Sequence, residues 1–269
     1  MHHANHFYGH AHVLAGYCGL DPEHPPRIDG YVQHGWNVVD GLGAGTPYVS
    51  GRPIFVWSEQ TRRRAWSMGR RYATVIGAPW LYLLATRPAE RGVPRAGTIW
   101  YPFHGWEGQH VAGDHQRLID EILETEDGPV TFCLYWHEFN NNRIRRRYER
   151  AGRVVCHGYR GLRWLDTDTR FLHNQLAELR AHRRVASNRL SSAVLYGAAV
   201  GCEPAVYGDP MHLDGEVRLT AERIRRQWPE LHGRHPDPAD ATASALSELG
   251  ADDLASPAEL RAVLGWAAA

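Results

Sequence analysis

The chain has 269 residues, of which 43% are hydrophobic, so it can bury the core of one large domain or of two smaller ones. Its 30 basic and 30 acidic residues cancel, which leaves no net charge to attract nucleic acid. All the basic residues are arginines, and the lack of lysine excludes a Schiff-base lysine and a phosphate-loop lysine.

The sequence also sets expectations for location and cysteine chemistry. No apolar run approaches the roughly 20 residues of a membrane span, and the start of the chain lacks the pattern of a secretory signal. We therefore expect a cytoplasmic protein without a transmembrane segment. The 4 cysteines stand singly, without the close pairs of zinc sites, and are expected to be reduced and mostly buried.

The first 90 residues predict a short α/β domain. Apolar spacing predicts a helix over residues 8–17 and strands near residues 30–32, 54–57 and 74–76. An arginine-rich helix is expected between the last two strands. Proline, glycine and charge concentrate in residues 88–97, which we expect to form a linker.

From residue 97 onward, strand and helix patterns alternate, as in a parallel sheet covered by helices. Five strands are expected, at residues 98–101, 130–136, 154–156, 184–186 and 205–207. Helices are expected between them, over residues 114–124, from the asparagines at 140–142 to Gly152, from Asp168 onward, and over residues 191–200. The first of these helices is expected to bury Leu118, Ile119, Ile122 and Leu123.

We therefore predict an α/β fold with two Rossmann-like domains, of which the N-terminal one is reduced. Residues 1–90 form the first domain, residues 97–215 the second, and residues 216–269 the helices that close the fold. In this last part Ser256, followed by Pro257 and by Glu259 three residues on, predicts a capping box at a helix start.

One short motif occurs twice. "YVQHGW" ends at Trp36, and "YPFHGW" ends at Trp106, so that His34 and His104 each follow the first predicted strand of a domain. Ligands of doubly wound sheets lie beyond the carboxyl ends of strands, so both histidines are expected on the functional edge, facing one cleft without sharing a ligand atom. The alternative is a packed histidine beside a buried tryptophan.

A polar turn at residues 187–192 has the composition of an anion site. Ser187, Asn188, Ser191 and Ser192 surround a predicted helix start, and Arg189 lies among them. Free amide groups, hydroxyls and the helix dipole favour an anion at such a place. Helix capping alone is the simpler interpretation, although one such residue would suffice for it.

Other polar groups follow the strands of the second domain. His137 and Glu138 follow one strand, and His157 and Arg160 follow the next, where a nucleotide base, ribose or phosphate could be bound. Loop residues held by local hydrogen bonds are the alternative for each. The arginine-rich helix near residues 143–150 is interpreted as a solvated surface or as a contact with an anionic acceptor or a membrane surface.

Metal binding is a further alternative because the chain has 17 histidines, including His10 and His12. A helical His-x-x-x-His pair with a nearby acid is lacking, so no metal site is predicted.

In the order of its motifs the sequence resembles bacterial GT-B glycosyltransferases of surface-polysaccharide clusters. The residues Gln33, His34 and Gly35 are similar to a Q-x-H-G segment of the CDP-glycerol glycerophosphotransferases, where the histidine is the proposed base. His104 and the Ser191-Ser192 pair are similar to donor-phosphate residues of sialyl- and Kdo-transferase-like enzymes. Gly105 stands where sialyltransferases have proline, and their acidic base motif has its nearest match at residues 28–30.

The resemblance implies a metal-independent transferase that moves a sugar, or a polyol phosphate, from a nucleotide-activated donor to an acceptor hydroxyl. His34 and His104 are the expected catalytic residues, and the polar groups described above are the expected donor-binding residues. A neutral histidine suits the role of base. The expected partners are a nucleotide sugar and a glycan or small-molecule acceptor, without a cofactor and without nucleic acid.

Two other functions stay open. A catalytically silent GT-B-like protein would bind a nucleotide or a glycan without transfer. A nucleotide-sugar epimerase or hydrolase on the same fold would act on the donor without an acceptor.

Overall fold

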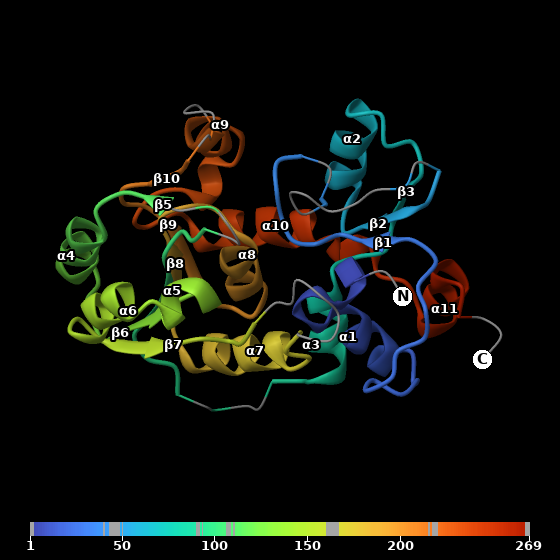
Figure 1. Ribbon diagram of the computed structural model, residues 1–269, viewed down its shortest axis with the longest axis horizontal. Helices are drawn as coiled ribbons and strands as arrows, with labels where there is room; N and C mark the ends of the chain where they lie inside the picture. The colour runs from blue at the N-terminus through green and yellow to red at the C-terminus, as the bar shows by residue number, and fades with distance from the viewer. Residues whose placement is uncertain are drawn as a thin grey trace. The chain divides into compact units, whose positions relative to one another are not determined.

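The computed structural model describes residues 3–39, 41–42, 49, 51–89, 92, 94–105, 109, 111–159, 167–214, 216 and 220–266 (Figure 1). The chain divides into two compact units, which are described one at a time. Unit 1 consists of Met1–Glu90, Tyr159–His173 and Leu246–Ala269, and unit 2 consists of Arg91–Gly158 and Asn174–Ala245.

Unit 1 contains a three-stranded parallel sheet. Its strands are β1 (Tyr31–Val32), β2 (Ile54–Val56) and β3 (Ala73–Val75), in that order across the sheet. All three predicted strands are confirmed, and no strand end differs from its predicted position by more than one residue. The central strand β2 is buried throughout, because it is covered on both faces.

The helices of unit 1 are partly those expected from the sequence. They are α1 (His10–Tyr17), α2 (Glu59–Ser67), α3 (Pro79–Thr86) and α11 (Pro257–Leu264). The predicted capping box of the last one is present, with Ser256 and Glu259 as its partners. Helix α3 was not expected, since a short and continuously apolar segment has no amphipathic period.

A side chain extends the edge of this sheet. Asn5 is fully buried in the 3₁₀ segment His3–Gly9, and its amide donates to the Gly30 carbonyl at 3.0 Å and accepts from the Val32 amide at 2.8 Å. These two bonds fix the N-terminal segment beside β1.

Unit 2 contains a five-stranded parallel sheet. Its strands are β4 (Thr98–Tyr101), β6 (Val130–Cys133), β7 (Arg153–Val155), β8 (Arg184–Ser187) and β9 (Glu203–Val206). The order across the sheet is β7-β6-β4-β8-β9, so the chain adds two strands on one side of β4 and then two on the other. In doubly wound sheets this reversal leaves a crevice between the first and fourth strands, here β4 and β8.

Helices pack on both faces of this sheet. On one face α4 (His115–Thr125) and α6 (Asn142–Glu149) bury Trp100 and Phe132. On the other face α8 (Ser192–Ala199) lies so close to β8 that a side chain at Gly197 would overlap Val185. Helix α7 (Phe171–Ala181), within the helix expected from Asp168 onward, buries leucines 172, 176 and 179.

Two sequence expectations for unit 2 are corrected. Leu123 of α4 is 47% exposed rather than inward, since Leu118, Ile119 and Ile122 already fill the buried face. The strand predicted over residues 130–136 ends at Cys133, and α5 (Trp136–Asn140) begins where the chain leaves the sheet. Among the helices expected over residues 216–269 is α10 (Pro238–Leu249), whose last four residues belong to unit 1.

The remaining elements of this unit lie around the carboxyl ends of the strands and in the C-terminal part. Strands β5 (Val111–Ala112) and β10 (His212–Leu213) pair antiparallel, so the segments that follow β4 and β9 are joined there. Helix α9 (Thr220–Gln227), one of the helices expected over residues 216–269, buries Ile224. No helix in the described part of the chain is long and apolar enough to cross a membrane.

Both units contain largely buried arginine–glutamate pairs among the described residues. In unit 1, Arg64 donates two hydrogen bonds to Glu248, at 3.1 and 2.8 Å. In unit 2, Arg184 lies 3.0 Å from Glu126, which also accepts from the Tyr207 hydroxyl at 2.6 Å. Buried charges of this kind are tolerated because every partner is hydrogen-bonded.

Candidate functional site

The imidazole of His34 lies at the carboxyl end of β1 and packs against two aromatic rings. It meets Phe7 edge to face at 4.6 Å between centroids, and it lies 5.2 Å from the Tyr8 ring. Its Nε2 is 3.5 Å from the Tyr8 hydroxyl, at the outer limit of a hydrogen bond. The histidine is half-buried, so one side of it is accessible.

A kink in the backbone brings these rings to His34. Tyr8 has a φ of 57°, and Gly9 follows with a φ of 77°. A side chain at Gly9 would lie 2.6 Å from the Thr169 carbonyl oxygen, so only glycine fits there. Left-handed backbone is costly for a tyrosine and is often found at functional sites. Tyr8 is not among the site residues predicted from the sequence, since an unusual φ leaves no sequence signal except the adjacent glycine.

The neighbours of His34 in the motif hold the loop in place. Gln33 is fully buried; its side-chain oxygen accepts from the Trp57 amide at 2.8 Å and its nitrogen donates to the Gly35 carbonyl at 3.0 Å. The Trp36 indole donates to the buried Glu248 at 2.8 Å. Gln33 and Trp36 are therefore positioning residues, and His34 is the polar member of the motif that remains partly exposed.

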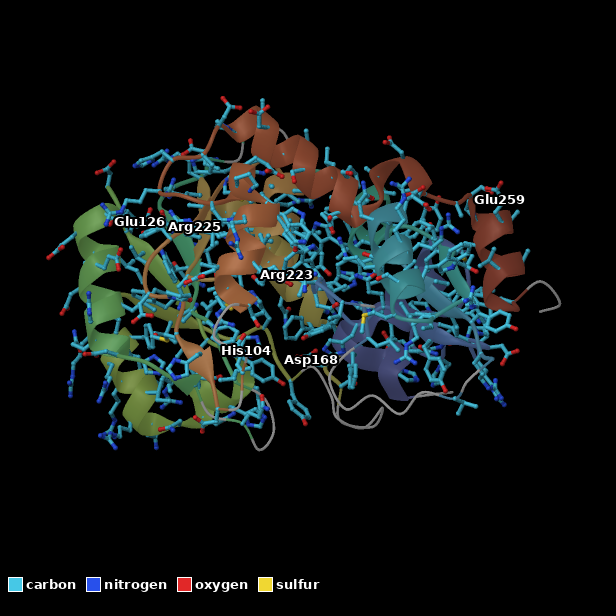
Figure 2. The ribbon with its side chains drawn as sticks, turned by 90° about the horizontal axis from the view of Figure 1, so that it is seen from above. His104, Glu126, Asp168, Arg223, Arg225 and Glu259 are labelled. Carbon is cyan, nitrogen blue, oxygen red and sulfur yellow. The ribbon has the colours of Figure 1, made fainter. Side chains whose placement is uncertain are left out.

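In unit 2 the corresponding histidine, His104, follows β4 at the crevice beside β8. Its Nδ1 lies 2.7 Å from the Gly105 carbonyl, so Nδ1 carries the proton and Nε2 is the acceptor of the neutral ring. The ring stacks on Tyr135, with 4.4 Å between centroids and 31° between planes. Figure 2 shows His104 well apart from Glu126, which lies at the amino end of the same sheet. Trp106 is outside the described residues.

Ser187 and Asn188 tie together the loops at this crevice. The Ser187 hydroxyl donates to the Tyr101 carbonyl at 2.7 Å. The Asn188 side chain accepts from the Phe103 amide and donates to the Asp209 carbonyl, both at 2.7 Å. Both side chains are buried, so these bonds give them a positioning role, and the donor contact expected of them stays a prediction.

Arg189 is held even more firmly. Its guanidinium forms a two-pronged ion pair with Glu216, at 2.6 and 2.8 Å, and also donates to the carbonyls of Pro210 and Met211. It lies 3.9 Å above the Phe103 ring. Four of its five N–H groups are thus used inside unit 2. A direct contact of Arg189 with donor phosphate stays a prediction.

Ser191 and Ser192 begin α8 beside the same crevice. Ser191 is the N-cap residue, yet its side chain makes no capping hydrogen bond. Both serines are half-buried, unlike the residues of β8 before them. Since an N-cap hydroxyl normally accepts from the first helical turn, this helix start can present a hydroxyl and backbone amides to an anion.

Glu138 connects the end of β6 to the loop that carries His104. One of its carboxylate oxygens accepts from the Gly105 amide at 3.1 Å. The other oxygen is buried and has no hydrogen-bond partner among the described residues. A buried carboxylate oxygen without a donor favours binding of a hydroxyl or amide group. His137, next to it, is exposed, and its ring lies 5.5 Å from that of Tyr135.

His157 lies beneath this crevice rather than on it. Its side chain is 3% exposed, and its Nε2 is 3.0 Å from the Tyr101 hydroxyl. Burial lowers the pKa of His157 to about 4, an effect that Glu178 partly opposes. A neutral and enclosed histidine supports the loop after β7. Arg160, the last predicted donor residue, lies outside the described residues.

The residues predicted for donor binding therefore divide into two groups within unit 2. The first group is at least partly accessible and consists of His104, His137, Glu138, Ser191 and Ser192. The second group is buried and holds the loops around the crevice; it consists of His157, Ser187, Asn188 and Arg189. Tyr135 was missed, although its place at the end of a predicted strand could have indicated it. The prediction that His34 and His104 face one cleft concerns both units and stays a prediction.

The histidines and acids do not gather as metal ligands in the described part of the chain. No group of three or more histidine, cysteine or acidic residues is arranged there to hold a metal ion. His6 and His12 do meet, with 3.1 Å between Nδ1 and Nε2, but His12 is also bound to the Pro22 carbonyl at 2.7 Å. Cysteines 18, 133 and 202 are buried and Cys156 is half-buried, all with free thiols.

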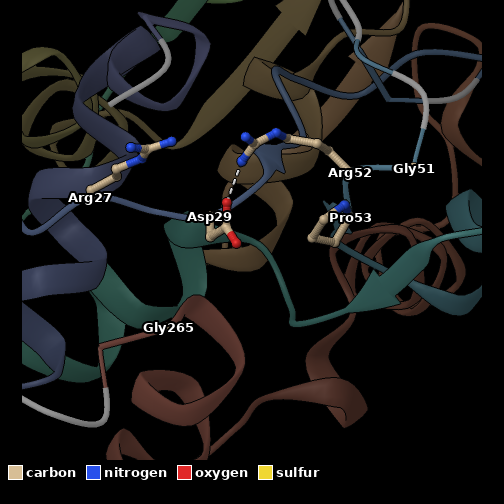
Figure 3. A pocket seen from close by; sticks show the side chains of 6 residues that line it. All are labelled: Arg27, Asp29, Gly51, Arg52, Pro53 and Gly265. Carbon is tan, nitrogen blue, oxygen red and sulfur yellow. Dashed lines mark hydrogen bonds and ion pairs between the residues drawn. The ribbon is translucent and has the colours of Figure 1, made fainter.

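A pocket of about 670 Å³ lies elsewhere in unit 1, at the amino ends of β1 and β2. Figure 3 shows the guanidinium groups of Arg27 and Arg52 pointing toward one another, with Arg52 paired to Asp29. Ligands of parallel α/β sheets bind beyond the opposite edge, and none of the predicted site residues lines this pocket.

No protein-family model and no curated protein sequence matches the chain. Among solved structures, it is similar to Os79 from O. sativa in complex with UDP, at 12% identity and a TM-score of 0.37, over 77% of this chain and 50% of that one. It is also similar to Os79 in complex with UDP and deoxynivalenol-3-glucoside, at 12% identity and a TM-score of 0.32, over 77% and 48%. The chain thus spans about half the length of these structures. At these TM-scores the similarity carries no argument about function.

Proposed function

We propose that the protein is a metal-independent glycosyltransferase-like enzyme of the GT-B type, which uses a nucleotide-activated sugar or polyol phosphate. The observation that carries the proposal is the strand order of unit 2. The order reverses between β4 and β8, and His104 and the uncapped start of α8 follow these two strands. Doubly wound sheets bind nucleotides at such a place.

In this proposal unit 2 binds the donor. The leaving phosphate accepts hydrogen bonds from Ser191, Ser192 and the first amides of α8, whose dipole favours negative charge. The free oxygen of Glu138 accepts from a sugar or ribose hydroxyl. Arg189 acts through Asn188 and Phe103, which fix the loops around the phosphate.

Unit 1 supplies the base. His34 takes the proton from the acceptor hydroxyl as the new bond forms, and the Tyr8 ring and hydroxyl orient the imidazole. The proton stays on His34 until it is released to solvent, while the electrons of the broken bond leave with the nucleotide phosphate. The reaction needs no metal, because the helix start and His104 meet the developing charge.

The close packing of His34 against Phe7 favours a second candidate, a catalytically silent protein of the same fold that binds a nucleotide or a glycan. The proposal also includes a glycan or a small molecule as the acceptor and the cytoplasm as the location of the protein.

The nucleotide site is tested by thermal shift with CMP, CDP, UDP, GDP and dTDP. We expect one of them to stabilise the wild type and the Ser191→Ala/Ser192→Ala double variant to lose most of that shift. The exposed Ser67→Ala variant is the matched control and should respond as the wild type does. If none of the five nucleotides raises the melting temperature, the proposal fails.

A further inference from the structure

Three large apolar side chains are exposed together at one end of α2. Trp66 is 53% exposed, Met68 51% and Tyr72 61%. Single exposed apolar residues are common on protein surfaces and need no explanation. Here three of them fall within seven residues of chain, at the end of one helix and in the turn that follows it.

The local fold keeps these side chains in solvent. Helix α2 buries Thr61 and Ala65, and the chain then turns back through bonds from the Met68 and Arg70 amides to carbonyls of the helix. At the turn, Gly69 has a φ of 83° and open space where a side chain would be. The turn leads into β3, the edge strand of the sheet, which lies beside α2 (Figure 1).

The same segment is basic. Residues 62–72 contain five arginines and no acidic residue, although Glu59, just before them, pairs with Arg62 and Arg63. Arg63 is nevertheless 78% exposed, and Arg71 is exposed without an ion-pair partner among the described residues. Arg62 is paired with Glu59, and its guanidinium lies 5.0 Å from the centre of the Trp66 ring, so it packs against one face of the tryptophan.

We propose that residues 62–72, the α2 tip, dock onto an anionic lipid bilayer. Tryptophan and tyrosine favour the interface between headgroups and acyl chains, because their rings are apolar at one end and polar at the other. Met68 adds apolar area, and Arg63 and Arg71 attract anionic headgroups. The inference is independent of the proposed transfer activity, since it uses none of the residues assigned to that site.

Helix α6 of unit 2 shows why charge alone does not define such a surface. It also carries several arginines, at positions 143, 145, 146 and 147, but none of the exposed large hydrophobic side chains lies on it. We therefore assign the membrane contact to the α2 tip and treat α6 as a solvated surface. The two helices supply matched variants for a test.

The test is co-sedimentation of the full chain with vesicles of phosphatidylcholine alone and of phosphatidylcholine with about one third phosphatidylglycerol. We expect binding to the anionic vesicles only, weakened by salt. Arg63→Glu/Arg71→Glu removes the attraction of two basic residues to the anionic surface. Trp66→Ala/Tyr72→Ala removes the apolar area that enters the bilayer. These two double variants should each lower the partition coefficient at least about tenfold. The controls Arg143→Glu/Arg146→Glu and Leu254→Ala/Val263→Ala should lower it less than about twofold, since they make the same kinds of change on exposed positions elsewhere.

Three results would overturn the proposal. An equal loss in the α6 variant would mean that net charge alone causes the binding. Binding to heparin that is as strong as binding to vesicles and independent of Trp66 would indicate a polyanion site. A dimer that dissociates in the Trp66→Ala/Tyr72→Ala variant, with no vesicle binding, would indicate that a second copy covers the surface. Circular dichroism spectra of all variants establish that they are folded.

Discussion

The two His-Gly-Trp motifs have the same sequence and different surroundings. In the first one, Trp36 is bound to the buried Glu248, and His34 contacts the rings of Phe7 and Tyr8. In the second, His104 stacks on Tyr135 and its Nδ1 donates to the Gly105 carbonyl. Both histidines are half-buried. Each follows the first strand of its unit, so the topology explains the repeat and the neighbours explain the difference.

This difference separates two kinds of chemistry. A histidine held by aromatic rings near a tyrosine hydroxyl is oriented for proton transfer to a small group. A histidine beside a helix start, at the crevice of a doubly wound sheet, is placed to meet a phosphate. The following predictions test whether the motifs differ in this way.

The largest effect is expected from Glu248→Ala, which removes the anchor of the first motif. The change leaves the Trp36 indole and the partly buried Arg64 guanidinium without the buried Glu248 acceptor, and the loss of one partner of a buried pair costs roughly 3–5 kcal/mol. The unfolding transition of unit 1 should fall by about 10 °C in a thermal melt followed by tryptophan fluorescence.

The matched control is Glu203→Ala. Glu203 also pairs with an arginine, Arg183, but both side chains are about half exposed, so the cost should stay below about 1 kcal/mol. If Glu248→Ala destabilises the protein no more than this control does, the first motif is not anchored in the way described.

The second prediction concerns catalysis in unit 1. With His34→Ala, kcat for transfer should fall by at least about 10²-fold, because a general base contributes that much or more, while the Kd of the nucleotide is unchanged. Tyr8→Phe removes only the hydroxyl that orients the ring and should cost a few-fold in kcat. Transfer at the wild-type rate in His34→Ala would rule out His34 as the base.

The sequence predicted most strands and the loops that carry polar groups. Strand β4 has the predicted bounds of Thr98–Tyr101, and the serines at 191 and 192 begin a helix as expected. Patterns of apolar and polar residues determine such elements locally. The expected helix over residues 140–152 is present, shortened to Asn142–Glu149 with Asn141 as its cap.

What the sequence could not predict is how each polar side chain is used. Ser187, Asn188 and Arg189 stand in the same segment as Ser191, yet their hydrogen bonds hold neighbouring loops. Those partners come from residues 101–103 and 209–216, which are distant in the chain. Likewise, the role of Tyr8 depends on its left-handed backbone, which adjoins Gly9 where that glycine packs against the distant Thr169.

The third prediction uses a buried histidine that lies near each motif. His10 in unit 1 and His157 in unit 2 are buried, and burial lowers their pKa values to about 3 and about 4. The backbone of Gln33 partly opposes the shift of His10, and Glu178 that of His157. An unfolded histidine titrates near about 6.5, so below that pH the unfolded state binds a proton that the folded state does not.

The free energy of unfolding is therefore unaffected by each histidine above about pH 6.5 and decreases as the pH falls below it. Each histidine should lower this free energy by about 2 kcal/mol between pH 6.5 and pH 5. Urea unfolding at both pH values should show this loss in the wild type, and His10→Gln or His157→Gln should each remove about 2 kcal/mol of the difference. The exposed His24→Gln is the control and should leave the difference unchanged. If both buried-site variants keep the wild-type difference, the two histidines are not neutral in the folded protein.

The smallest effect is expected at His104. Its Nδ1 proton is directed to the Gly105 carbonyl, so a contact of the ring with donor phosphate must be made through Nε2, and that atom donates only in the protonated ring. His104→Ala should therefore weaken nucleotide binding by about tenfold, the value of one charge-assisted hydrogen bond. Isothermal titration with the nucleotide measures the change in Kd. If His34→Ala lowers kcat at an unaltered Kd, the reverse pattern in His104→Ala would establish that the second motif serves the donor. A His104→Ala variant that instead loses kcat at unchanged Kd would assign proton transfer to both motifs and remove the distinction between them.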